Sequence, residues 1–358
     1  MSVTFIQNAE TTKLISKPSF ADFPDNAPIH AAFRLIELRK GTVSPPGAMA
    51  RRVAFGVADT PEMAAQLSGF EAIERYALQY SADVEQTCQS LFSSDGIVHE
   101  LPLGALALGA RETNGTISSK GAAAGPTLAD AALRAVYECL EHALDGAGDY
   151  SHVASPECLP DALVSWLAKH LRTLEIHVQP FPEIGLLVRV VCSDFDGGRP
   201  CYGTAFAAEL EQGALSAAGE AIVSWRNMVT LEHKGVTPQG MDADESRFFE
   251  LYRGARGDRP ISPHTVFDVE TWSPPAPEIA QTLDFAAKVL GTPVAVFDMT
   301  AADIPLPVVK AVPITGKGHA PVSLRAIPAC PGPHPTGFRR DLQRRRFPCS
   351  AHSLATRG

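Results

Sequence analysis

The stretch Leu67-Ser68-Gly69-Phe70-Glu71-Ala72-Ile73-Glu74-Arg75-Tyr76 decides how the chain is interpreted, because a similar stretch follows later in the sequence. It lies in a helix predicted over residues 60–80. Thr60-Pro61-Glu62 supplies an N-cap, a proline at the first helical position and an acid in the first turn. A second start of this kind stands at Thr127, and its helix is predicted to end near Leu144. The sequence therefore contains two related helices.

The two helices align without gaps, with Glu71 on Glu138 and Glu74 on Glu141. Because caps, alanines and acids all match, an internal duplication is favoured over chance similarity between two Ala-rich helices. The predicted helix 214–225 resembles a third copy, since it carries Glu220, although no acid follows three residues later.

Acids three residues apart project from one face of a helix, where like charges repel. A single pair of this kind is most often a solvated helix face. Two pairs on duplicated helices with apolar neighbours instead favour bound cations. Mg²⁺ prefers carboxylates together with substrate phosphates, so the four acids predict a site for metal and triphosphate.

The stretch Ser118 to Gly125 precedes the second helix and consists mostly of small residues. Such a stretch lets backbone N–H groups approach an anion at a helix N-terminus. It is not a Walker A loop, because G-x-x-x-x-G-K-[ST] is missing. Taken alone, a tightly packed loop is the better interpretation.

Composition limits the classes of partner. The chain has 358 residues, 45% of them hydrophobic, and a net charge of −9, which argues against nucleic acid or an anionic membrane as the main partner. No secretory signal or membrane span is apparent, so we expect a cytoplasmic protein. The seven scattered cysteines contain no C-x-x-C, which argues against zinc and a disulfide framework.

The predicted fold class is mixed α/β (α+β). Strands are expected near 51–58, 186–194, 201–208, 293–300 and 307–314, with a further helix at 279–290. We expect an irregular segment over 1–49, a catalytic domain over 50–314 and a Pro/Arg-rich segment over 315–358. That last segment has seven arginines against one acid, and is either a poorly ordered tail or a sequence read out of frame.

These motifs resemble the signatures of the YcaO family. Residues 67–76 are similar to its first motif, and residues 118–125 with 131–141 to its second. The helix 214–225 resembles its third. Asp298-Met299-Thr300 and the run 304–313 look like its D-x-T and P-V-V segments. The resemblance covers roughly residues 50–314. It implies a YcaO-like fold with duplicated helix–strand units around a nucleotide cleft.

The resemblance also implies an activity. YcaO proteins use ATP and Mg²⁺ to phosphorylate a peptide backbone amide, as azoline-forming cyclodehydratases or in thioamidation, for example in bacteriocin biosynthesis. Carried over position by position, the metal ligands would be Glu71, Glu74, Glu138 and Glu141. The residues that bind or support the nucleotide would be these four together with Ser68, Arg75, Ser119, Lys120 and Glu220.

Departures from the family pattern leave an alternative open. Val57, Lys120 and Ser216 stand where many members have other residues, and two of these changes remove a positive charge. A non-catalytic scaffold or leader-peptide-binding protein is therefore the alternative. The Pro-rich ending of azoline-forming members is absent, which favours thioamide chemistry. Expected partners are a peptide substrate, a TfuA-like or leader-binding protein, and a second copy in a homodimer.

Overall fold

The computed structural model describes residues 2–24, 26–39, 53–79, 86–107, 111–112, 115–116, 119–145, 150–235, 243–254, 265–304 and 306–314. The predicted tail 315–358 lies outside these residues, as does Ser118 at the start of the small-residue stretch. Within them the chain mixes helices and strands, as the mixed α/β prediction states.

The first sheet is formed largely by the N-terminal part of the chain. Its strand order is β1-β2-β3, and all neighbours are antiparallel. The helix α1 precedes it and packs on the helix α2 through Ile6, which lies against Gly69. The prediction of an irregular segment over 1–49 is therefore corrected, since it contains three elements. The bounds in this region are α1 Ser2–Thr11, β1 Ser19–Phe20, β2 His30–Leu35, β3 Val53–Ala58 and α2 Pro61–Ala77.

The second sheet has the order β12-β11-β10-β9-β13. Its centre is a long antiparallel hairpin of β10 and β11, followed by β12. The strands predicted at 186–194 and 201–208 are confirmed as the antiparallel neighbours β11 and β12. The helices α4 and α5 pack against it in one apolar core. The bounds are β9 His152–Ala154, α4 Asp161–Lys169, β10 Arg172–Phe181, β11 Gly185–Asp194, β12 Cys201–Ala207, α5 Leu210–His233, α6 Ala243–Gly254 and β13 Thr265–Val266.

The third sheet combines segments that are far apart in sequence, in the order β5-β4-β14-β15-β8. The predicted strands 293–300 and 307–314 are its central antiparallel pair, β14 and β15. The helix predicted at 279–290 is confirmed as α7. The bounds are β4 Thr87–Ser93, β5 Glu100–Pro102, β8 Ala122–Ala124, α3 Leu128–Asp145, α7 Ile279–Leu290, β14 Val294–Asp298 and β15 Val308–Pro313; a small hairpin pairs β6 Arg111–Glu112 with β7 Gly115–Thr116.

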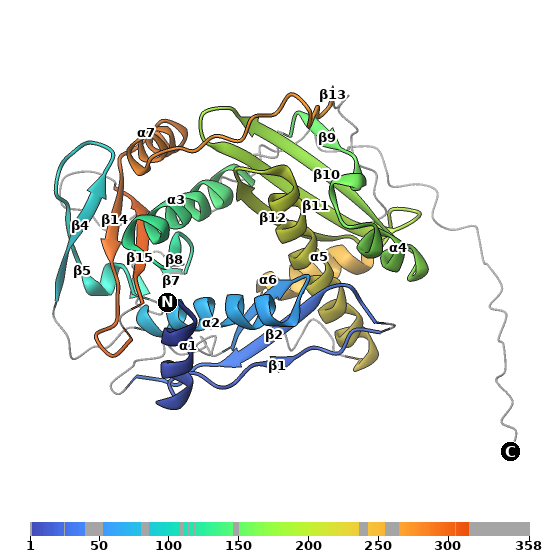
Figure 1. The fold of residues 1–358 in the computed structure, drawn as a ribbon, viewed down its shortest axis with the longest axis horizontal. Helices are drawn as coiled ribbons and strands as arrows, with labels where there is room; N and C mark the ends of the chain where they lie inside the picture. Colours follow the sequence, from blue (N-terminus) through green and yellow to red (C-terminus); the bar gives the residue numbers. More distant parts are fainter. Residues whose placement is uncertain are drawn as a thin grey trace, which may run out of the picture.

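Three helices join the three sheets into a ring (Figure 1). The core around α2 includes residues of the first and third sheets. The core around α3 includes residues of the third sheet and of β11 and β12. The core around α5 combines the second sheet with Val57 of β3 and with Ile29, the residue before β2. Figure 1 shows α2, α3 and α5 facing the middle of the ring, so polar residues on their inner sides can meet there.

Each joining helix follows a strand, and the acidic residues occupy the same helical position. Glu71, Glu138 and Glu220 are each the eleventh residue of their helix, counted from Pro61, Leu128 and Leu210. The strand before α2 packs against it very closely, because a Cβ at Gly56 would lie 2.3 Å from the Ser68 backbone nitrogen. The repeated unit is therefore a strand followed by a helix with an acid in a fixed place, and α5 belongs to the series.

Candidate active site

The acids of α2 lie beside the free edge of the first sheet. β3 is an edge strand, and its Phe55 N–H donates to Glu71 Oε2 at 2.9 Å. The other Glu71 oxygen pairs with Arg75 Nη2 at 2.5 Å, and Arg75 Nη1 also donates to the Val53 carbonyl at 2.7 Å. Glu71 is therefore fixed by a backbone amide and a cation, which orients it on the inner side of α2.

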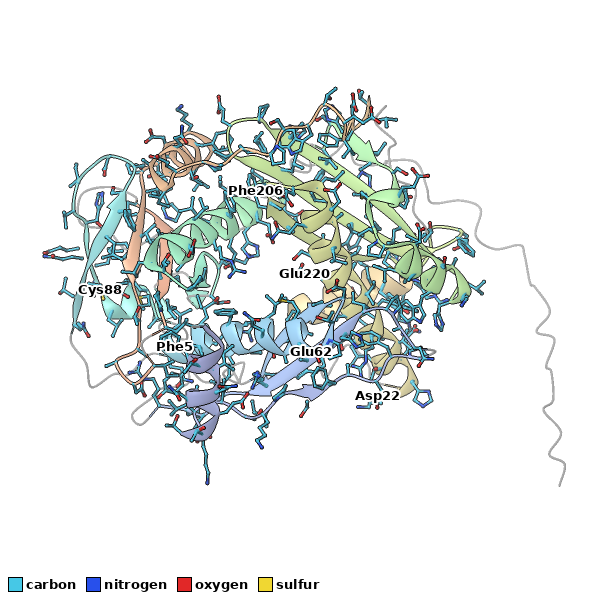
Figure 2. All side chains as sticks on the ribbon, in the orientation of Figure 1. Phe5, Asp22, Glu62, Cys88, Phe206 and Glu220 are labelled. Carbon is cyan, nitrogen blue, oxygen red and sulfur yellow. The ribbon has the colours of Figure 1, made fainter. Side chains whose placement is uncertain are left out.

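At the edge of the second sheet, backbone N–H groups likewise donate to glutamates of neighbouring helices. β12 is its edge strand, and the Thr204 N–H donates to Glu220 Oε2 at 3.3 Å. The Phe206 N–H, two residues along the same edge, donates to the Glu141 carboxylate. One strand edge thus brings together an acid of α3 and an acid of α5. Figure 2 labels Glu220 on α5 beside the centre of the ring.

Burial makes the negative charges of this group costly. It raises the pKa of Glu74 well above its ordinary value, and the charges of Glu138 and Glu71 raise it further. Burial likewise raises the pKa of Glu141, followed by the charge of Glu220. The carboxylates of three helices therefore form one electrostatically coupled group.

Glu220 has a smaller pKa shift. Its side chain is exposed at the surface of α5, although many chain atoms surround its carboxylate. Burial raises the pKa of Glu220 to about 7, the Thr204 amide opposes the shift, and the charges of Glu71 and Glu138 add to it. Near neutral pH this side chain is therefore divided between its neutral and charged forms.

The hydrogen bonds of the Ser68 side chain go to residues other than the carboxylates of the site. Its side chain is fully buried, and its hydroxyl accepts from Arg34 Nε at 3.1 Å and donates to the Ala65 carbonyl at 2.9 Å. Arg34 in turn pairs with Glu10 of α1. These contacts attach α2 to the N-terminal elements, so Ser68 contributes to the support of the helix.

Ser119 and Lys120 are both half-buried and lie just before β8. The Ser119 carbonyl accepts from the Ala122 N–H at 2.9 Å, which closes a tight turn. Gly121 has a φ of +78°, and a Cβ there would lie 2.4 Å from the Ala311 carbonyl oxygen. Only glycine fits this close approach to β15, and the same Cβ would lie 3.8 Å from the Cys139 Cβ, so the turn stands beside the later part of α3.

Two residues that sequence reasoning missed complete the charged region. Asp145 ends α3, and its Oδ1 accepts from Arg189 Nη2 at 2.8 Å, Tyr150 Oη at 2.8 Å and Thr204 Oγ1 at 3.2 Å. Asp145 also raises the pKa of Glu141 and of Glu220. In the sequence, Asp145 carries only the signal of a helix end, whereas Arg189 is an isolated charge in an apolar strand.

The residues suit a metal held together with a phosphate better than a metal held by protein alone. In the described part of the chain, no three His, Cys, Asp or Glu side chains lie close enough to one point to hold a metal ion. Mg²⁺ usually takes one or two carboxylates and completes its shell with water and substrate phosphates. Acids that are near one another but do not form a closed cage fit this pattern.

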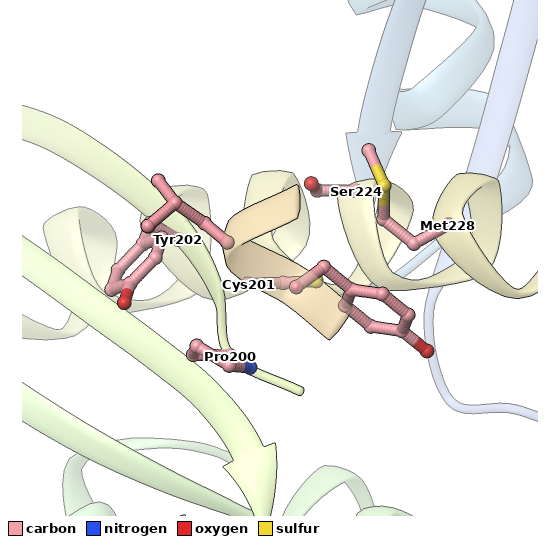
Figure 3. A pocket seen from close by; sticks show the side chains of 7 residues that line it. Pro200, Cys201, Tyr202, Ser224 and Met228 are labelled. Carbon is pink, nitrogen blue, oxygen red and sulfur yellow. The ribbon is translucent and has the colours of Figure 1, made fainter. Parts of the chain in front are cut away.

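A small pocket lies outside the coupled carboxylates, between β12, α5 and α6 (Figure 3). Its volume is about 30 Å³, enough for a water molecule and far too small for a nucleotide. Its lining residues are Pro200, Cys201, Tyr202, Ser224, Met228, Leu251 and Tyr252. None of the predicted site residues belongs to it.

The fold is shared with solved structures at low sequence identity. A heterocyclase in complex with substrate and cofactor gives a TM-score of 0.66 at 15% identity, over 86% of this chain and 52% of that one. The chain thus spans about half the length of that heterocyclase. YcaO from Methanopyrus kandleri, bound with AMPPCP and Mg²⁺, gives 0.61 at 12% identity, over 87% and 90%. The E. coli microcin synthetase McbBCD complex gives 0.60 at 13%, over 83% and 87%.

A comparison with curated protein sequences found no match. None of the helices in the described part of the chain is long and apolar enough to span a membrane. The family model described as YcaO cyclodehydratase, ATP- and Mg²⁺-binding, matches residues 101–313. This confirms the family and the cofactors that the sequence predicts, and it begins well inside the predicted catalytic domain. The chain belongs to the YcaO family.

Proposed function

We propose that this chain binds ATP and Mg²⁺ between α2, α3 and α5 and uses ATP to activate a peptide backbone amide. One observation carries the proposal. Carboxylates of three helices lie together in the middle of the ring, where burial raises the pKa of Glu74 and Glu141. Charges arranged at such a cost are typical of a site that a ligand completes.

Each predicted residue has a role in this proposal. Glu71, Glu74, Glu138 and Glu141 would hold Mg²⁺ against the phosphates. Glu220 would contact ribose or phosphate, and the turn with Ser119 and Lys120 would line the nucleotide. Arg75 orients Glu71, and Ser68 supports α2 through Arg34.

The bound nucleotide and metal would supply a phosphoryl group that turns the amide oxygen into a good leaving group. The chain's own residues then bind and orient the two substrates. If a Cys, Ser or Thr side chain of the peptide attacked the amide carbon, departure of the phosphorylated oxygen as phosphate would give an azoline. If external sulfide attacked, the same departure of phosphate would give a thioamide.

Calorimetric titration with a non-hydrolysable ATP analogue and Mg²⁺ tests the proposal. Glu71→Gln and Glu138→Gln keep the side-chain shape and remove one charge each, and we expect both to abolish Mg²⁺-dependent binding. Glu62→Gln is the matched control, because Glu62 is an exposed acid in the first turn of α2 (Figure 2). Unchanged affinity in both site variants would contradict the proposal.

A non-catalytic scaffold remains the second candidate. Val57 lies against Gly219 of α5, and Ser216 is exposed, so neither position brings a cation to the carboxylates. Absence of binding heat in the wild-type protein would favour this candidate. Binding followed by phosphate release in the presence of a peptide substrate would exclude it.

A further inference from the structure

Among the described residues, two arginines contact the carboxylates of the site directly, and they differ in how they are held. Arg75 has both ends of its guanidinium engaged, by Glu71 and by the Val53 carbonyl. Arg189, on β11, has a single ion pair, with Asp145. Its donors are therefore engaged far less completely than those of Arg75.

The position of Arg189 is nevertheless well defined. Its guanidinium carbon lies 5.4 Å from the centre of the Tyr150 ring and 5.6 Å from that of Tyr202. The Tyr150 hydroxyl is bonded to the same Asp145 oxygen that pairs with Arg189. Tyr202 also lines the small pocket of Figure 3. Two rings and a carboxylate thus fix the guanidinium before any ligand binds.

One donor of this group is buried without an acceptor. Arg189 Nε has no hydrogen-bond partner within the described structure, although a buried N–H nearly always has one. A guanidinium is a planar fork of five donors that matches the oxygens of a phosphate. The arrangement is therefore suited to an anionic oxygen that is supplied from outside the chain.

Arg189 borders the coupled carboxylates through its neighbours. It lies directly opposite Thr204 in the β11–β12 register, and the Thr204 amide bonds Glu220. Its partner Asp145 faces both Glu141 and Glu220. A triphosphate neutralised by metal at those acids would still carry negative charge that a cation at this end of the site can bind.

We propose that Arg189 is a phosphate-binding residue, which donates to an oxygen of the ATP triphosphate while Asp145, Tyr150 and Tyr202 hold it in place. The inference rests on the proposed nucleotide site. It adds a residue that lies on a strand outside the motif helices, and it makes the chemistry of the ligand specific: a polyphosphate, held at one end by metal and at the other by a guanidinium.

The experiment measures the affinity for a non-hydrolysable ATP analogue with Mg²⁺ in Arg189→Gln and Arg189→Lys. We expect a loss of at least about tenfold in Arg189→Gln, with Arg189→Lys between that variant and the wild type, because the charge remains but the fork does not. Arg199→Gln is the control. Arg199 pairs with Asp194 at the far end of β11 and is largely exposed, so its removal should leave the affinity unchanged.

Removing Arg189 also leaves Asp145 unpaired, and that charge alone would repel a nucleotide. The double variant Asp145→Asn/Arg189→Gln separates the two effects. If Arg189 contacts phosphate, the double variant stays at least about tenfold weaker than Asp145→Asn alone. Equal affinities of these two variants would overturn the inference, as would unchanged affinity in Arg189→Gln.

The remaining outcomes also decide the question. Circular dichroism checks that each variant is folded, and unfolding of both Arg189→Gln and Arg189→Lys would assign Arg189 to stability and overturn the inference. Equal losses of affinity in Arg189→Gln and Arg189→Lys would show that the retained positive charge contributes nothing to binding. That outcome contradicts an ionic contact with phosphate and would also overturn the inference. Absence of binding in the wild type would instead refute the proposed function itself, so the two failures are distinguishable.

Discussion

Glu220→Gln should stabilise the protein without ligand while it weakens nucleotide binding. The amide keeps an oxygen that can accept from the Thr204 N–H, so the edge of β12 stays closed. The substitution removes the negative charge of the Glu220 carboxylate. That charge destabilises the folded state, because burial raises the pKa of Glu220 to about 7. In an unfolded chain the pKa of a glutamate is about 4.3. The folded state therefore holds this proton over a pH range in which the unfolded state has lost it.

The magnitude follows from this shift. One pKa unit corresponds to about 1.4 kcal/mol, so the full shift would be worth about 3–4 kcal/mol. Because Glu220 is exposed, solvent screening reduces the gain expected for the variant to about 1–2 kcal/mol. For a domain of this size that corresponds to a rise in Tm of about 1–3 °C.

The pH determines whether the variant is more stable than the wild type. A carboxyl group whose pKa is raised by folding stabilises the folded state below the unfolded value, and this contribution is lost as the pH rises towards the folded value. The Tm of Glu220→Gln should therefore match that of the wild type near pH 4.5 and exceed it at pH 8. Thermal unfolding followed by circular dichroism at both pH values measures this. A variant that is equal to or less stable than the wild type at pH 8 would refute the reasoning.

Three further predictions concern other parts of the molecule. The affinity for the ATP analogue with Mg²⁺ should rise between pH 6 and pH 8, because burial raises the pKa of the proposed ligands Glu74 and Glu141 and metal binding must release their protons, by at most about tenfold per pH unit for each proton released; calorimetry in buffers of different ionisation enthalpy would detect the protons, and a flat profile would contradict this. Gly56→Ala should lower the free energy of unfolding by about 1–3 kcal/mol, because its Cβ would lie 2.3 Å from the Ser68 nitrogen; a urea midpoint equal to that of the wild type would exclude such close packing. Thr60→Ala removes the oxygen that accepts from Met63 N and should cost about 1 kcal/mol in the same assay, with Thr60→Ser as the conservative control that retains most of the stability.

Elements with strong local signals could be predicted from the sequence. The start of α2 follows from Thr60 and Pro61, and β11 and β12 follow from the β-rich runs on either side of the turn at residues 196–198. By contrast, α1 has no acid in its first turn and no base in its last. It is stabilised by contacts such as that of Ile6 with Gly69, which no local pattern reveals.

The site was predictable only where its residues repeat. The acids of α2 and α3 stand in register, so the duplication indicated them, and Glu220 followed by analogy with the third family motif. Asp145 and Arg189 could not be found in this way. Asp145 is at the end of α3 and Arg189 is on β11, so their ion pair depends on how these two distant segments pack in the fold.

The carboxylates that accept hydrogen bonds from the edge strands also affect hydrogen–deuterium exchange measured at single backbone amides. The N–H groups of Phe55, Thr204 and Phe206 are shielded from deuterium uptake by side chains and not by a neighbouring strand. If a metal ion draws those oxygens away, the same three amides lose their acceptors first. Their exchange rates would then report occupancy of the centre directly, from sites distributed over two separate sheets.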